Sequence, residues 1–138
     1  MSLVDLDSIK SLSKKIEIKA NVSGGSVANS IVALAQNNIN TAFIGKVGND
    51  EVGDSFIKGL ENEKVVFENS AQSDESETGR CLVMVTPDAQ RTMSTYLGIS
   101  QKLNASDVND DVIANSKITY LEGCLLYTSP SPRDETKS

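Results

Sequence analysis

Residues 24–53 read GGSVANSIVALAQNNINTAFIGKVGNDEVG, and this stretch indicates the fold class. Apolar side chains recur every three or four positions after the two glycines, which predicts a helix over about 26–37. Thr41–Val47 is short, apolar and β-prone, so we expect a buried strand there. Gly48–Asp50 is typical of a turn, and its last two residues can cap a second helix over about 51–62.

The flanking segments extend this alternation of strands and helices. Cys81–Thr86 places Leu82 and Met84 on the face opposite Cys81, Val83 and Val85. Pro87 supplies a turn and Thr92–Leu97 returns, so 79–97 is predicted to be a β-hairpin. The other expected elements are a helix over about 5–14, strands at Ile16–Ile18, Lys64–Phe67 and Lys117–Leu121, and a short helix capped by Ser106. Strands that alternate with helices indicate an α/β fold with a parallel sheet, into which the hairpin is inserted.

The composition restricts the class of protein. The chain has 138 residues and a formal net charge of −6, with 13 Lys and Arg against 19 Asp and Glu. This length suits one domain, and the lack of a basic stripe argues against nucleic acid as a partner. No apolar run approaches the roughly 18 residues of a membrane span. Because the chain has no His, it contains neither a Ser-His-Asp triad nor a His-based metal site.

The two adjacent glycines before the first predicted helix form a candidate binding loop. Gly24 and Gly25 lack a Cβ and let the backbone approach a ligand closely, while Asn29 lies in the first helical turn. Backbone N–H groups and the Asn29 amide could together hold a polar ligand with vicinal hydroxyls. The alternative is a simple turn with Asn29 on the helix surface. The spacing matches neither G-x-x-x-x-G-K-[ST] nor G-x-G-x-x-G.

Three segments together resemble the ribokinase/PfkB family of carbohydrate and nucleoside kinases: GGSVANS at 24–30, IGKVGNDEVG at 44–53 and TGRC at 78–81. GGSVANSIVALAQ and TGRC are most similar to the adenosine kinase branch, and TPDAQRTMSTYLGIS at 86–100 is similar to adenosine-kinase-like sugar kinases of bacteria. The resemblance implies a ribokinase-like α/β fold, incomplete in this chain. In that fold a parallel central sheet is flanked by helices and carries a small β lid, here about 79–97.

The same resemblance implies an activity, which is ATP-dependent phosphoryl transfer, with Mg²⁺, to a hydroxymethyl group of a sugar or nucleoside. In the family, the Gly-Gly pair and the Asn contact the sugar hydroxyls, which implies this role for Gly24, Gly25 and Asn29. The implied partner is therefore a small-molecule sugar or nucleoside, with neither nucleic acid nor membrane. The chain would be a monomer or a lid-mediated dimer.

Further residues of the hairpin match family positions. Met93, Thr95 and Leu97 match positions that line the nucleoside pocket of adenosine kinases, and the predicted strand places them on one face. Cys81 matches another pocket position, although it is otherwise an ordinary small buried hydrophobe. Arg91 matches an arginine that approaches the transferred phosphates; the alternative is a solvated hairpin residue. Four residues are expected to shape the strand–helix turn rather than touch substrate: Gly45, Gly48, Asp50 and Gly53.

The catalytic aspartate of the family lies in a C-terminal Gly-Ala-Gly-Asp motif, at a helix N-terminus that serves as an anion hole. This chain has no such motif, so we expect no catalytic residue and no activity from it alone. Met1–Asp5 resembles a segment that follows the family's first strand, so both ends are expected to be missing. Two alternatives stay open: a non-catalytic sugar- or nucleoside-binding module, and a Rossmann-type nucleotide-binding domain. A Rossmann-type domain would have an acidic residue at the end of its second strand, and Thr41–Val47 ends without one.

The end of the chain has a different origin in this interpretation. Residues 124–134 read CLLYTSPSPRD, which resembles the conceptual translation of a transposase-type sequencing adapter. We therefore expect 124–138 to be a non-native, disordered tail and 1–123 to be a partial kinase domain. A genuine flexible tail rich in Ser and Pro is the alternative. Cys81 would then be the single native cysteine, which suits a reducing cytoplasm.

Overall fold

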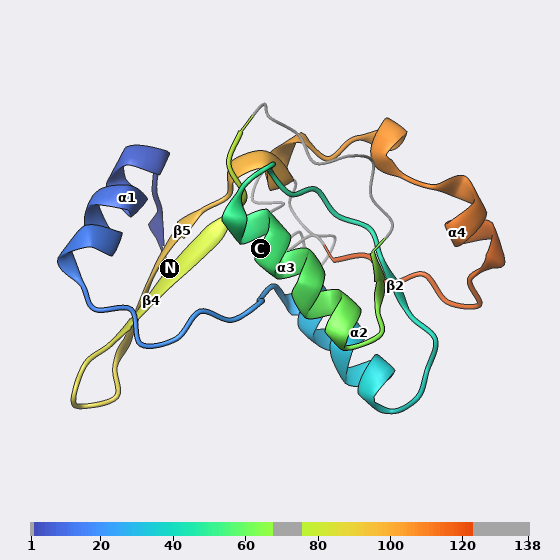
Figure 1. Cartoon of the computed structure of the whole chain (residues 1–138), viewed down its shortest axis with the longest axis horizontal. Coiled ribbons are helices and arrows are strands. Elements are labelled where there is room, and N and C mark those ends of the chain that lie inside the picture. Colours follow the sequence, from blue (N-terminus) through green and yellow to red (C-terminus); the bar gives the residue numbers. More distant parts are fainter. Residues whose placement is uncertain (1, 68–75, 123–138) are drawn as a thin grey trace, which may run out of the picture.

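The computed structural model describes residues 2–67 and 76–122 (Figure 1). The helices are α1 (Leu6–Lys15), α2 (Ser26–Gln36), α3 (Glu51–Asn62) and α4 (Asp110–Asn115), with the 3₁₀ turns η1 (Gly98–Lys102) and η2 (Ala105–Asp107). The strands are β1 (Ser2–Leu3), β2 (Ala42–Phe43), β3 (Val66–Phe67), β4 (Arg80–Val85) and β5 (Arg91–Tyr96). The three long predicted helices and the predicted hairpin are thereby confirmed.

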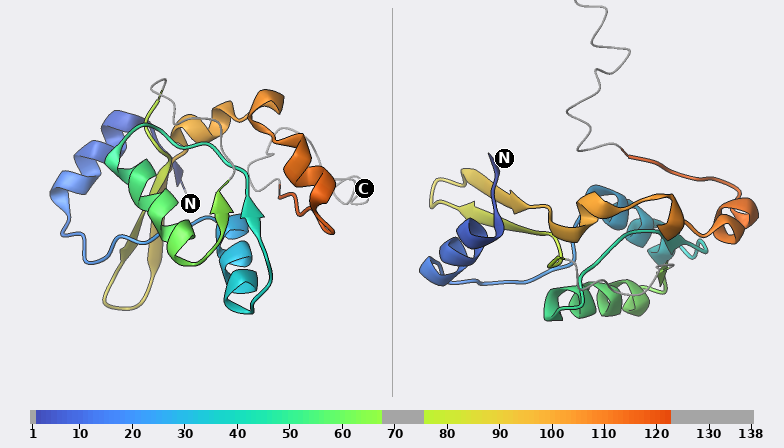
Figure 2. Two further views of the ribbon diagram at one scale, coloured as in Figure 1. Left: turned by 45° about the vertical axis from the view of Figure 1, so that its right-hand side comes forward. Right: turned by 90° about the horizontal axis from the view of Figure 1, so that it is seen from above.

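The strands form two sheets. One has the order β1-β5-β4, in which β1 runs parallel and β4 antiparallel to β5. In the other, β2 and β3 pair in parallel, joined through α3 as the α/β pattern requires. Figures 1 and 2 show α1 and the hairpin at one end of the molecule, α2 and α3 beside the parallel pair, and α4 at the other end.

The main hydrophobic core lies between α2, α3 and the parallel sheet. Leu60 of α3 is fully buried and packs in one cluster with Ala28 and Val65. The rings of Phe43 and Phe56 meet edge to face, with centroids 5.8 Å apart. Because burial of one such side chain stabilises by roughly 1.5–3 kcal/mol, this cluster holds both helices on the sheet.

The hairpin has one covered and one open face. α1 begins after Asp5, whose side chain accepts a hydrogen bond from the backbone N–H of Ser8 at 2.7 Å, and it packs against β5. Ile9 of α1 is fully buried, and Ser94 of β5 is only 7% exposed. Side chains alternate between the two faces of a strand, and exposure alternates along β4 in the same way. The face opposite Ser94 is therefore accessible.

Two predicted strands are wrong. Ile16–Ile18 and Lys117–Leu121 adopt no strand, and the side chains of Ile118 and Leu121 are 87% and 88% exposed. A strand requires a neighbour that pairs with its backbone N–H and C=O groups, and neither segment has one among the described residues. For the same reason β2 and β3 are shorter than predicted, since pairing covers only two residues of each.

The C-terminal part is also arranged differently from the prediction. Ser106 does not cap a helix but lies inside η2, which begins after Asn104. Asn109 caps α4 instead, and its side chain accepts from the N–H of Asp111 at 3.0 Å. A partly buried ion pair joins η2 to the segment after β2, with Lys46 Nζ 3.0 Å from both carboxylate oxygens of Asp107. The predicted foreign tail, 124–138, lies outside the described residues.

Candidate functional site

The predicted binding loop is an uncapped helix start. Gly25 is the N-cap of α2, with φ of 108° and no side-chain hydrogen bond to the first turn. This positive φ favours glycine. A Cβ added at Gly24 would meet nothing within 4 Å, and one at Gly25 would meet only the Cβ of Ala28, at 3.9 Å. The backbone of the loop is therefore open to a ligand.

Asn29 lies one turn into α2 and is exposed. Its backbone N–H donates to the carbonyl of Gly25 at 2.9 Å, the ordinary helical bond that places it one turn after the loop. Its side-chain amide makes no hydrogen bond within residues 2–67 and 76–122. Gly24, Gly25 and Asn29 thus form one group, in which an amide without a partner follows an uncapped helix start.

The hairpin brings together a second group on its open face. Cys81 stands directly opposite Thr95, and Val83 stands opposite Met93. The hydroxyl of Thr95 donates to the Cys81 sulfur at 3.2 Å. The interpretation of Cys81 as a small buried hydrophobe is wrong, because its side chain is exposed on this face. The cause is that nothing in the described structure covers the face.

Two further predicted residues stand apart from this group. Leu97 is the residue after β5 and has helical backbone angles, φ −79° and ψ −28°, so strand alternation does not extend to it. Arg91 is exposed at the start of β5 and makes no hydrogen bond or ion pair with the described residues. Its contact with phosphates stays a prediction, as do the substrate contacts of the other residues.

The turn before α3 is a partly buried polar junction. Asp50 caps α3, and its Oδ1 accepts from the N–H of Gly53 at 2.8 Å and from the hydroxyl of Thr78 at 2.7 Å. Its Oδ2 accepts from the N–H of Thr78 at 2.8 Å. The Thr78 hydroxyl in turn accepts from the N–H of Gly48 at 2.9 Å. The expected role of Gly48, Asp50 and Gly53 in shaping the turn is confirmed.

The environment of Asp50 favours its ionised form. Burial raises the pKa of this carboxyl, but hydrogen bonds from Thr78 and Gly53 and the charge of Arg80 outweigh burial and hold the pKa below its usual value. Sequence reasoning missed Thr78 as a member of this junction. The sequence feature that could have indicated Thr78 is its place next to Gly79 in the TGRC segment. Its contact with Asp50 could not be predicted, because the two residues are 28 positions apart and no local pattern links them.

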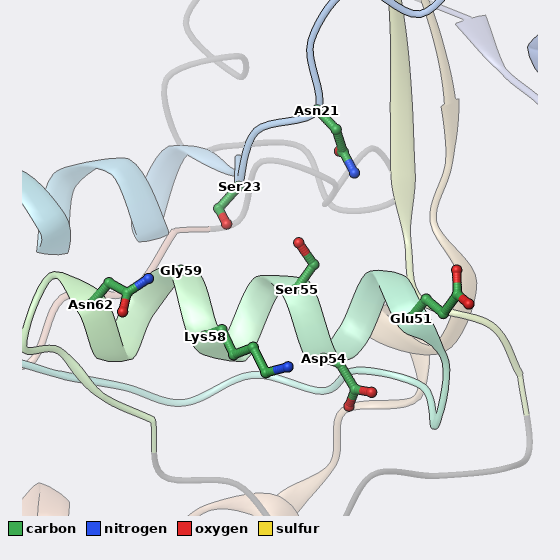
Figure 3. A pocket seen from close by; sticks show the side chains of 8 residues that line it. All are labelled: Asn21, Ser23, Glu51, Asp54, Ser55, Lys58, Gly59 and Asn62. Atoms are coloured by element: carbon green, nitrogen blue, oxygen red, sulfur yellow. The ribbon is translucent and has the colours of Figure 1, made fainter.

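A separate hollow of about 530 Å³ lies between residues 21–23 and α3. In Figure 3 the side chains of Asn21, Ser23 and Ser55 extend toward the gap, whereas Asp54 and Lys58 extend from the other side of the helix. None of the predicted substrate-binding residues lines this hollow.

The described residues contain no group of three or more His, Cys, Asp or Glu side chains that could hold a metal ion. None of the helices in the described part of the chain is long and apolar enough to cross a membrane.

Comparison with protein families shows to which family the chain belongs. The model of the pfkB family carbohydrate kinases matches residues 6–136. The chain belongs to the pfkB family of carbohydrate kinases. The predicted family and the predicted ribokinase-like α/β fold are thus confirmed. The matched range includes residues 124–136, whose foreign origin stays a prediction.

Individual members of the pfkB family cover most of this chain. The 5-dehydro-2-deoxygluconokinase of Clostridium beijerinckii is 33% identical over 114 residues, and the ribokinase of Mus musculus is 29% identical over 110. Each alignment covers 78% of this chain and 33% of the relative, so the chain spans a third of their length. The crystal structure of adenosine kinase from Sinorhizobium meliloti matches with a TM-score of 0.83 at 34% identity, covering 98% of this chain and 41% of that one.

Proposed function

We propose that the intact protein is an ATP-dependent kinase that phosphorylates a hydroxymethyl group of a sugar or nucleoside. In this proposal the present chain supplies the sugar-binding loop and the lid. The observation that carries the proposal is the uncapped start of α2 at Gly25, followed one turn later by an Asn29 amide that has no hydrogen-bond partner among the described residues. Membership of the pfkB family supports the reaction class.

The loop suits a ligand with neighbouring hydroxyl groups. The first N–H groups of a helix lack partners inside the helix, and at α2 the N-cap Gly25 supplies no side chain to replace them. Those donors would bind the hydroxyl oxygens of a sugar, while the Asn29 amide both donates and accepts. Bound at Gly24 and Gly25, the sugar would replace the water that solvates the loop.

The hairpin would act as the lid. Its open face carries Cys81, Met93 and Thr95, with Leu97 at its end, and this mainly apolar surface would exclude water from the bound substrate. Arg91, at the start of β5, would approach the transferred phosphates on closure. Thr95 would present a hydroxyl to a polar substrate group.

The reaction itself would need groups from the rest of the intact enzyme. The substrate hydroxyl attacks the γ-phosphoryl group of ATP in line, so positioning and charge stabilisation supply most of the catalysis. The family's C-terminal aspartate would assist deprotonation of that hydroxyl. The described residues do not fit a Mg²⁺ site, so the ion is assigned to none of them.

The test is a substrate panel on the full-length enzyme encoded by the uninterrupted gene. The panel compares ribose, fructose, 5-dehydro-2-deoxygluconate and adenosine with ATP as donor. We expect Asn29→Ala to raise the KM for the accepted substrate about tenfold, because several hydroxyl contacts lose their partner. Asn62→Ala is the matched control, since Asn62 is also an exposed helical asparagine and should leave KM unchanged.

An unchanged KM in Asn29→Ala would show that the sugar-binding role is wrong. Substrate binding by calorimetry without any turnover would instead favour the non-catalytic binding module.

A further inference from the structure

The proposed lid is joined to the rest of the molecule by two backbone segments that contact each other. The chain enters β4 through Thr78–Gly79 and leaves β5 through Leu97–Gly98. A Cβ at Gly79 would lie 2.6 Å from the carbonyl oxygen of Leu97, and Gly98 has φ of +54°. Both ends of the hairpin are therefore in direct backbone contact, which these glycines permit.

Thr78, which lies in the first of these segments, is hydrogen-bonded to the start of α3 rather than to the hairpin. Its hydroxyl and its N–H both donate to the Asp50 carboxylate, which also caps the first turn of α3. Thr78 is only 5% exposed and Asp50 is half-buried, so these hydrogen bonds are partly shielded from water. One carboxylate thus joins the start of α3 to the entry of the hairpin.

The junction has no spare room. A Cβ at Gly53 would lie 2.9 Å from the Thr78 hydroxyl, and a Cβ at Gly48 would lie 2.6 Å from the carbonyl oxygen of Ser76. Any displacement of Thr78 must therefore break its hydrogen bonds with Asp50 and Gly48 or create close contacts. Beyond Gly79 the chain is less tightly packed, because one face of β4 is exposed along its length.

We infer that Asp50 and Thr78 are positioning residues, which form the fixed pivot about which the hairpin closes on substrate. The inference rests on the proposed function, since it requires a hairpin that closes. The two residues act through the hairpin, because they hold its entry at one point on α3 while the open face moves. Without this pivot, substrate binding must also order the junction, and the competent closed state becomes less populated.

The first test is Thr78→Val in the full-length kinase. Valine keeps the shape of threonine but removes the hydroxyl, so Gly48 N–H and Asp50 Oδ1 each lose a partner. We expect kcat/KM for the phosphoryl acceptor to fall about tenfold, with the KM for ATP changed less than about twofold. Thr78→Ser is the matched control, because it restores the hydroxyl and should recover most of the loss.

The second measurement separates positioning from simple loss of stability. Hydrogen exchange of the β4 and β5 amides is compared with and without the acceptor. We expect the acceptor to protect these amides in the unaltered enzyme and in Thr78→Ser, but not in Thr78→Val. A merely structural role would raise exchange equally in both conditions and keep the difference. Acceptor-dependent protection in Thr78→Val would overturn the inference.

Asp50→Asn takes the place of Thr78→Val if the valine variant does not fold, because asparagine still caps α3 but offers no second acceptor to the Thr78 N–H. It should show the same loss of protection, and full protection there would also overturn the inference. If the unaltered enzyme phosphorylates no sugar or nucleoside, the proposed function fails and the pivot fails with it. If turnover and protection occur and all variants behave like the unaltered enzyme, only the pivot fails.

Discussion

At the scale of single residues, the carboxylate of Asp50 shows how neighbouring groups set the pKa of a side chain. Asp50 accepts three hydrogen bonds, from Gly53 and twice from Thr78, and Arg80 adds a favourable charge. Burial alone would raise its pKa, yet these interactions together lower it. Asp50 is thus ionised at neutral pH and linked to the stability of the junction.

The lowered pKa predicts an acid-sensitive contribution to stability. A group with a folded-state pKa below its unfolded value of 3.8 stabilises fully above that value, and its contribution is lost as pH falls through the folded pKa. We expect the free energy of unfolding to fall on acidification below about pH 4, and less steeply in Asp50→Asn. Urea denaturation at a series of pH values measures both slopes.

Asp5 and Asp88 also have lowered pKa values, so the unaltered protein and the Asp50→Asn variant will both lose some stability in acid. The difference between the unaltered protein and Asp50→Asn isolates Asp50, because these two groups are common to both. Identical slopes in the two proteins would contradict the assignment.

At the scale of elements, the helices depend on one small core. Leu60 of α3 has no exposed surface and contacts the cluster formed with α2 and the parallel sheet. Leu34 of α2 offers a matched comparison, because it is also a helical leucine but is 43% exposed. The two residues therefore separate the effect of burial from that of the substitution.

We predict that Leu60→Ala lowers the free energy of unfolding by about 2–5 kcal/mol, since it removes buried surface and leaves a cavity. Leu34→Ala should cost less than about 1 kcal/mol. Urea denaturation of both variants measures the difference. Equal losses would mean that α3 is not anchored through this cluster.

At the scale of the whole molecule, the chain is a part of the family's architecture. It spans a third of the length of the two curated kinases compared above, and the segment 117–121 has no described strand beside it. We predict that chain 1–138 alone hydrolyses or transfers no phosphate from ATP, in the presence or absence of sugars. A coupled assay that detects turnover by the purified chain would contradict this prediction.

Several features were predictable from the sequence because their causes are local. Gly24-Gly25 starts a helix, Asp50 caps one, and residues 79–97 form a hairpin, since backbone freedom, capping and alternation act within a few positions. The family resemblance, too, needed only the order of short motifs along the chain, and comparison confirms it. The limits of α1, α2 and α3 followed for the same reason, whereas those of α4 did not.

Other features were decided only by tertiary structure. Lys117–Leu121 has the composition of a strand but no partner strand within 2–67 and 76–122, and Cys81 has the size of a core residue but faces solvent. The contact of Thr78 with Asp50 likewise joins residues 28 positions apart. Strand pairing, exposure and long-range hydrogen bonds all depend on what lies opposite a residue in space, and a local pattern carries no information about that neighbour.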